Sequence, residues 1–150
     1  MRVLLDVNVV IDVLARRAPF FTDSYAVLQL VAAGTLDGFI TAGSVADIDY
    51  ILRRQGLDRH QSRAALASLT QVVSVEDTRG TDVTAALGSA VPDLEDAILA
   101  SAAWRLGADA IVTRDQRDFA HSPVPAMTPA ALLAAWAAAP DTQSPPPAGS

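Results

Sequence analysis

The sequence contains no cysteine and no lysine, so all 11 of its basic residues are arginine. The absence of cysteine excludes disulfide bonds, thiolate zinc sites and cysteine nucleophiles. The absence of lysine excludes the lysine of a phosphate-binding P-loop and Schiff-base chemistry. Aromatic residues make up only 5% of the chain, and we therefore expect a core built from aliphatic residues and alanine.

Long hydrophobic runs are also missing. No stretch approaches the ~20 apolar residues that span a bilayer. The apolar start of the chain is interrupted by Asp6 and Asp12, which is unlike the apolar region of a secretory signal. We therefore expect a cytoplasmic protein with no membrane association.

The chain has 150 residues, 51% of them hydrophobic and 19% charged. These values exclude bulk disorder and indicate one ordinary domain. The formal net charge of −6 argues against a generic basic surface for nucleic acid. The charge is unevenly distributed along the chain. Residues 53–63 hold four arginines and one aspartate, a local net charge of +3. Residues 140–150 are rich in proline and serine and are predicted to be a disordered tail after a domain of residues 1–139.

Predicted strands and helices alternate along the chain. Short aliphatic strands are expected at residues 2–5, 38–41, 72–75 and 110–113. Helices are expected at residues 8–16, 22–33, 44–54, 59–69, 82–87 and 92–106, and a last helix follows Thr128 with Pro129 in its first turn. This alternation predicts an α/β fold with a parallel sheet.

Four aspartates fall at positions where one edge of such a sheet can gather them. Asp6 and Asp115 follow predicted strands, and functional groups collect beyond the carboxyl ends of parallel strands. Asp96 lies early in the helix at 92–106, and Asp47 lies early in the helix at 44–54, next to its apolar stripe.

Each aspartate also has a structural interpretation. Asp6 can cap a helix, and Asp47 lies three residues after Ser44, in a near capping box. Asp96, with its neighbours Asp93 and Glu95, can favour a helix dipole, and Asp115 can belong to a turn. Carboxylates held together repel one another unless a cation lies between them. Oxygen ligands without histidine or cysteine select Mg²⁺ or Mn²⁺, and such ions activate water for phosphodiester hydrolysis.

Four segments resemble the motifs of PIN-domain ribonucleases, in the correct order. They are LLDVNVVID, SVADIDYILRR, PDLEDAILASAAWRLGADAIVTRDQRDF and VPAMTPAALL, and together they extend from residue 1 to about residue 135. The similarity is greatest to the VapC-type toxins of toxin–antitoxin pairs. It implies a PIN-like three-layer sandwich, with a central parallel sheet of four to five strands flanked by helices. Val7 stands where the family usually has threonine.

The resemblance also implies site residues. The acids that match the catalytic positions are Asp6, Asp47, Asp96 and Asp115. The implied metal ligands are Asp6, Asp96, Asp115 and Asp118, and the implied supporting residues are Asn8, Asp93, Glu95 and Thr113. Two choices stay open: Asp115 or Asp118 as the fourth acid, and Asp47 or Asp49 as the second. Asp49 can instead pair with Arg53, four residues on in the helix.

The activity implied by the family is a Mg²⁺-dependent endoribonuclease, with Mn²⁺ as an alternative ion. Its partners are RNA, a cognate antitoxin protein that inserts a segment near the acidic site, and a second copy in a homodimer. The candidate contacts for RNA phosphates or an acidic antitoxin segment are Arg16, Arg17, Arg53, Arg54, Arg114 and Arg117. The alternative for each is a solvated surface arginine.

Other functions compete with this one. A PIN-like fold that has lost activity would serve only as a dimerising or antitoxin-binding module. A phospho-aspartate phosphatase needs a second acid where Asn8 stands and a lysine that the chain lacks. Trp104 and Trp136 are expected in the core or at a dimer interface.

Overall fold

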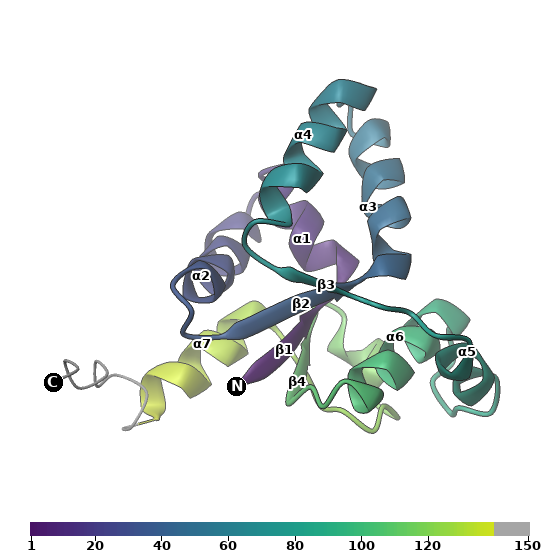
Figure 1. Cartoon of the computed structure of the whole chain (residues 1–150). Coiled ribbons are helices and arrows are strands. Elements are labelled where there is room, and N and C mark those ends of the chain that lie inside the picture. Colours follow the sequence, from purple (N-terminus) through teal and green to yellow (C-terminus); the bar gives the residue numbers. More distant parts are fainter. Residues whose placement is uncertain (140–150) are drawn as a thin grey trace, which may run out of the picture.

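The computed structural model describes residues 1–139, and the predicted tail at 140–150 lies outside them. Five strands form one sheet in the order β3-β2-β1-β4-β5, and every neighbouring pair is parallel. Seven α-helices and one short 3-10 helix accompany this sheet in the described part of the chain (Figure 1). The predicted α/β sandwich with a central parallel sheet is confirmed.

The strands are β1 (Arg2–Leu5), β2 (Asp37–Thr41), β3 (Ser74–Glu76), β4 (Ala110–Val112) and β5 (Ala126–Met127). The helices are α1 (Val7–Leu14), α2 (Phe21–Ala32), α3 (Ala42–Arg54), α4 (Arg59–Leu69), α5 (Gly80–Leu87), α6 (Leu94–Arg105) and α7 (Pro129–Ala138), and the 3-10 helix spans Gln116–Phe119. None of the helices at residues 1–139 is long and apolar enough to cross a membrane.

The central strands are buried on both faces because helices cover both sides of the sheet. Side chains alternate along β1, so Val3 and Leu5 join the cluster beneath α1, α2, α3, α4 and α7, while Leu4 joins the cluster beneath α5 and α6. The core is aliphatic and alanine-rich, as the low aromatic content predicts, and Phe39 is its largest fully buried side chain.

One close approach depends on glycine. Gly38 lies in β2 beneath α2, and a Cβ atom at this position would lie 2.6 Å from Cγ2 of Val31. A side chain larger than hydrogen therefore does not fit between this strand and α2 unless the helix shifts.

Several predicted elements differ from the structure. The strand predicted at 72–75 is β3 at Ser74–Glu76, because the amides of Val72 and Val73 donate to the carbonyl of Leu69 and close the turn after α4. Strand β5 was not predicted, since two residues are too short to show periodicity. Trp104 is 66% exposed, so the expectation of a core position is wrong for that residue.

Candidate functional site

Three strands end at the same edge of the sheet, and each delivers polar groups there. Asp6 follows β1, Thr41 ends β2 and Thr113 follows β4. The register of the parallel pairs places these ends side by side, with Leu5 opposite Val112 and Leu4 opposite Phe39. This edge is where an α/β sheet places its functional groups.

Asp6 caps a helix, as one of its two interpretations predicts. One carboxylate oxygen accepts a hydrogen bond from the amide of Val7 at 2.8 Å and caps α1. The other oxygen accepts a hydrogen bond from the hydroxyl of Thr113 at 2.8 Å. The cap and the hydroxyl together fix the direction of the carboxylate toward the space between α3 and α6.

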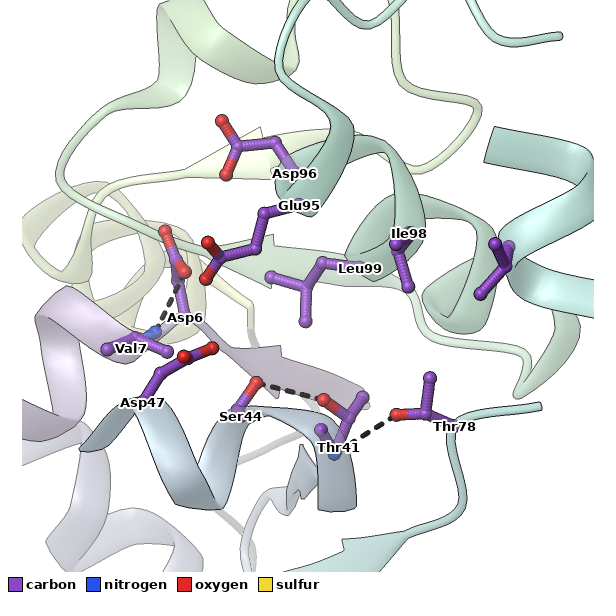
Figure 2. A pocket seen from close by; sticks show the side chains of 12 residues that line it. Asp6, Val7, Thr41, Ser44, Asp47, Thr78, Glu95, Asp96, Ile98 and Leu99 are labelled. Carbon is purple, nitrogen blue, oxygen red and sulfur yellow. Dashed lines mark hydrogen bonds between the residues drawn. The ribbon is translucent and has the colours of Figure 1, made fainter. Parts of the chain in front are cut away.

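That space is a cavity of about 190 Å³ with four carboxyl groups on its wall. Asp6 comes from the end of β1, Asp47 from α3, and Glu95 and Asp96 from the first turn of α6. Figure 2 shows the carboxyl groups of Asp6, Asp47 and Glu95 around one space, with Asp96 on the same side. The remaining wall is apolar or carries hydroxyls, including Ser44, Thr78 and Leu99.

Burial and mutual repulsion make three of these acids, Asp6, Glu95 and Asp96, unusually weak. Burial, together with the nearby charges of Asp6, Asp93, Asp118 and Glu95, raises the pKa of Asp96 to about 7. Burial also raises the pKa of Glu95, and the neighbouring Asp47 raises it further. The pKa of Asp6 is raised by burial even though Thr113 and Val7 donate hydrogen bonds to it. A site of this kind is stabilised by a cation.

The donor set fits Mg²⁺ or Mn²⁺ in its chemistry, because it consists of oxygen ligands without histidine nitrogen or thiolate sulfur. Within residues 1–139, however, no three acidic, histidine or cysteine side chains are already close enough together to form a metal-binding group.

The segment after β4 is held by a network of hydrogen bonds. Thr113 is buried, and its hydroxyl accepts from the amide of Asp115 at 3.0 Å. The Asn8 side chain donates to Asp115 at 3.1 Å and accepts from the amide of Arg114 at 3.3 Å. Asp118, in the 3-10 helix, raises the pKa of both Asp6 and Asp96 through its charge. Both candidates for the fourth acid thus lie near the cavity.

The choice between the two acids of α3 follows from their surroundings. Asp47 lines the cavity, whereas Asp49 accepts a hydrogen bond of 2.6 Å from Ser62 of α4. Asp49 therefore contacts α4 instead of pairing with Arg53.

The prediction of a near capping box at Ser44 is wrong. The N-cap of α3 is Thr41, and Ser44 lies inside the helix, hydrogen-bonded to the Thr41 hydroxyl at 2.9 Å.

Asp93 has a positioning role at the start of α6. This helix begins at Leu94 instead of Pro92, and the Asp93 carboxylate caps it by accepting from the amide of Asp96 at 3.0 Å. Asp93 also adds negative charge beside Asp96 and Glu95. The capping interpretation and the auxiliary role predicted for Asp93 are therefore compatible.

A fully buried acid of α1 was missed in the sequence. Asp12, in α1, is fully buried, and its carboxylate lies 2.6 Å from Nε of Arg114 and 3.8 Å from Nη1 of Arg17. The Arg114 guanidinium also lies over the Phe20 ring, 4.2 Å from the centroid. Burial raises the pKa of Asp12 against the effect of both arginines. The available signal was an acid inside the apolar run VVIDVL, one helical turn after Asn8.

The six predicted arginine contacts come from different elements and have different neighbours. Arg114 and Arg17 face the buried Asp12, and Arg16 lies 6.0 Å from the Phe21 ring. Arg53 and Arg54 lie exposed in the last turn of α3, and Arg117 lies exposed in the 3-10 helix.

Comparisons with known proteins agree with this arrangement. The sequence profile of the PIN domain family matches residues 2–117. A chain of the VapBC2 complex from Rickettsia felis, solved with a DNA fragment from its promoter, is similar at a TM-score of 0.69 and 16% identity, over 85% of this chain and 98% of that one. A chain of FitAB bound to the IR36 DNA fragment is similar at a TM-score of 0.67 and 16% identity, over 85% of this chain and 94% of that one. A chain of FitAcB from Neisseria gonorrhoeae is similar at a TM-score of 0.64 and 17% identity, over 85% of this chain and 97% of that one. No curated protein matches by sequence.

Proposed function

The chain belongs to the PIN domain family, and we propose that it is a divalent-metal-dependent endoribonuclease that acts as the toxin of a toxin–antitoxin pair. The observation that carries the proposal is the cavity at the strand ends, where four carboxyl groups share one wall and burial and repulsion raise the pKa of Asp96 to about 7. A wall of oxygen ligands with excess negative charge suits a divalent cation and an attack on a phosphodiester.

Each acid has a distinct place in the proposed mechanism. Asp6, Asp96, Asp115 and Asp118 would hold Mg²⁺ or Mn²⁺, and Asp47 and Glu95, which line the same cavity as Asp6 and Asp96, would accept a proton from the attacking water. A bound ion would lower the pKa of a water molecule and neutralise charge on the scissile phosphate. The products implied by the family are a 5′-phosphate and a 3′-hydroxyl.

The surrounding residues keep these acids in place. The Thr113 hydroxyl donates to Asp6, and the Asn8 amide donates to Asp115. Asp93 orients the first turn of α6, which carries Asp96. Such hydrogen bonds from neighbouring side chains orient metal-binding carboxylates in general. Val7, which replaces the usual threonine, supplies no hydroxyl at this edge.

The antitoxin and homodimer parts of the proposal rest on different support. The similar chains come from complexes named VapBC2 and FitAB, which supports an antitoxin partner for this chain. Exposed leucines on neighbouring helices, Leu87 of α5 at 70% and Leu94 of α6 at 50%, support an apolar contact with a second copy. Size-exclusion chromatography with light scattering checks the dimer, and a monomer at micromolar concentration contradicts it.

The enzymatic part is tested by RNA cleavage with Mg²⁺ and with EDTA, using protein freed from its antitoxin. We expect cleavage by the wild type only with the metal, and a loss of at least about 100-fold in Asp6→Asn and Asp96→Asn, the range associated with removal of one electrostatic contact in the transition state. Asp23→Asn, an exposed position on α2, is the matched control and should retain activity. A wild type that is inert toward RNA supports the binding-module alternative, and equal cleavage by all variants refutes the assigned site.

A further inference from the structure

Helices α3 and α4 form a hairpin that projects from the sheet, and their connection lies at its far end (Figure 1). Four arginines lie at this end, and we call them the basic tip: Arg53, Arg54, Arg59 and Arg63. All four are exposed. The tip lies at the opposite end of α3 from Asp47 and the acidic cavity.

The positive charge of the basic tip is not balanced locally. Among residues 1–139, the arginines with a carboxylate within 4.0 Å are all elsewhere in the fold. The carboxylate of Asp58 is used to cap α4, where it accepts from the amide of Gln61 at 2.8 Å. The carboxylate of Asp49 is bonded to Ser62. An acidic chain of net charge −6 thus holds a concentrated patch of the opposite sign.

Helix stability accounts for only half of the basic tip. Arg53 and Arg54 lie in the last turn of α3, where a cation interacts favourably with the helix dipole. Arg59 is the first residue of α4, whose first turn contains no acid. A cation at that end opposes the dipole by roughly 0.3–1 kcal/mol, and Arg63 follows one turn later. The helix dipole therefore does not account for the position of these two arginines.

A ridge of α3 connects the cavity to the basic tip. Asp47, Tyr50 and Arg54 are spaced at i, i+3 and i+7 and so lie on one side of the helix. Tyr50 is 61% exposed, and Nη1 of Arg54 donates to its hydroxyl at 3.1 Å. Seven residues of helix span about 10 Å, which corresponds to roughly three stacked nucleotides at about 3.4 Å each.

We propose that the basic tip and Tyr50 bind the RNA strand at least about three nucleotides from the bond that is cut, with the arginines on phosphates and the tyrosine ring against a base. This rests on the proposed ribonuclease function. RNA fits better than an acidic protein segment, because a solvent-exposed ring beside guanidinium groups is the surface on which single-stranded bases stack. The tip then supplies the affinity for phosphate that the acidic cavity lacks.

The test compares two triple variants of the full-length chain with equal net charge. Arg54→Gln/Arg59→Gln/Arg63→Gln removes three charges from the tip. Ala131→Glu/Ala134→Glu/Ala135→Glu adds three negative charges on exposed positions of α7, away from the tip (Figure 1). With an RNA of about 20 nucleotides and Mg²⁺, we expect the tip variant to raise KM roughly tenfold or more at nearly unchanged kcat, because charge-assisted phosphate contacts are lost. The slope of log(kcat/KM) against log salt is negative, and its magnitude should decrease by about 2 in the tip variant.

Two further measurements distinguish the possible outcomes. Binding of fluorescent RNA in EDTA reports on the tip without cleavage, and a substrate cut to two nucleotides on each side of the cleaved bond should remove the difference in KM. Equal KM and equal binding for the two triple variants overturn the proposal. A tip variant that loses only antitoxin binding also overturns it and assigns the tip to a protein partner. RNA binding that depends on the tip, without any cleavage by the wild type, supports the tip and refutes the enzymatic function.

Discussion

Replacement of Asp96 by asparagine should stabilise the metal-free protein at alkaline pH. In the folded protein, burial and the surrounding carboxylates raise the pKa of Asp96 from 3.8 to about 7. A raised pKa in the folded state favours folding at low pH, and this contribution is lost as the pH rises through about 7. Asparagine is neutral at every pH, so the variant avoids the repulsion that ionised Asp96 experiences.

The size of this effect follows from the shift. Of the pKa shift of roughly three units, about two units fall between pH 5 and pH 7. At about 1.36 kcal/mol per unit, the wild type can lose at most roughly 2.7 kcal/mol of unfolding free energy over this interval. Asp96 is half-buried, and we halve the ceiling for screening by solvent, to about 1.4 kcal/mol. For a chain of this size, that difference shifts Tm by about 3–5 °C.

The assay is thermal and urea unfolding in EDTA at pH 5 and pH 8, with Asp23→Asn as the control. We expect Asp96→Asn to gain about 1.4 kcal/mol over the wild type between the two pH values, while the control gains nothing. Addition of Mg²⁺ or Mn²⁺ at pH 8 should stabilise the wild type much more than the variant, because the ion binds only the folded site. A variant that gains no stability at pH 8, or that responds to metal as the wild type does, refutes the reasoning.

Two further predictions concern the interior. Arg114→Gln should lower the free energy of unfolding by about 3–5 kcal/mol, since it leaves the fully buried Asp12 with only Arg17, at 3.8 Å. Asp12→Asn should lower it by less, because the Arg114 that it leaves is only half-buried. In urea denaturation the double variant should lose less than the sum of the two, and strict additivity argues against a coupled pair. Gly38→Ala should lower stability by about 1–3 kcal/mol, because the added methyl lies 2.6 Å from Val31, and a variant with wild-type Tm contradicts that crowding.

The order and type of most elements could be predicted from local pattern. The last helix begins where Thr128 and Pro129 predict it, and α4 spans the predicted residues 59–69. The errors occur where contacts between residues distant in sequence determine whether and where an element forms. Strand β5 exists because Ala126 and Met127 pair with β4, and β3 is placed by pairing with β2.

The candidate site shows the same division. The positions of Asp6 and Asp115 after strands follow from the sequence, because strand ends and caps depend on neighbouring residues. The sequence could not distinguish the roles of Asp47 and Asp49, because the two acids are only two residues apart on one helix. Asp49 has its partner, Ser62, only because α4 packs against α3. The burial of Asp12 was missed for the same reason, because its partner Arg114 lies about a hundred residues away in the chain.

The sequence by itself determined the α/β class, the absence of thiol and lysine chemistry, and the motifs of the PIN domain family, because composition, periodicity and spacing are local properties of the chain. The tertiary structure decided which carboxyl groups share a cavity and how strongly burial and repulsion raise the pKa of Asp96. It also separated the acidic cavity from the basic tip along α3. These features depend on which faces of the helices meet the sheet, and that is set by packing between elements far apart in the chain.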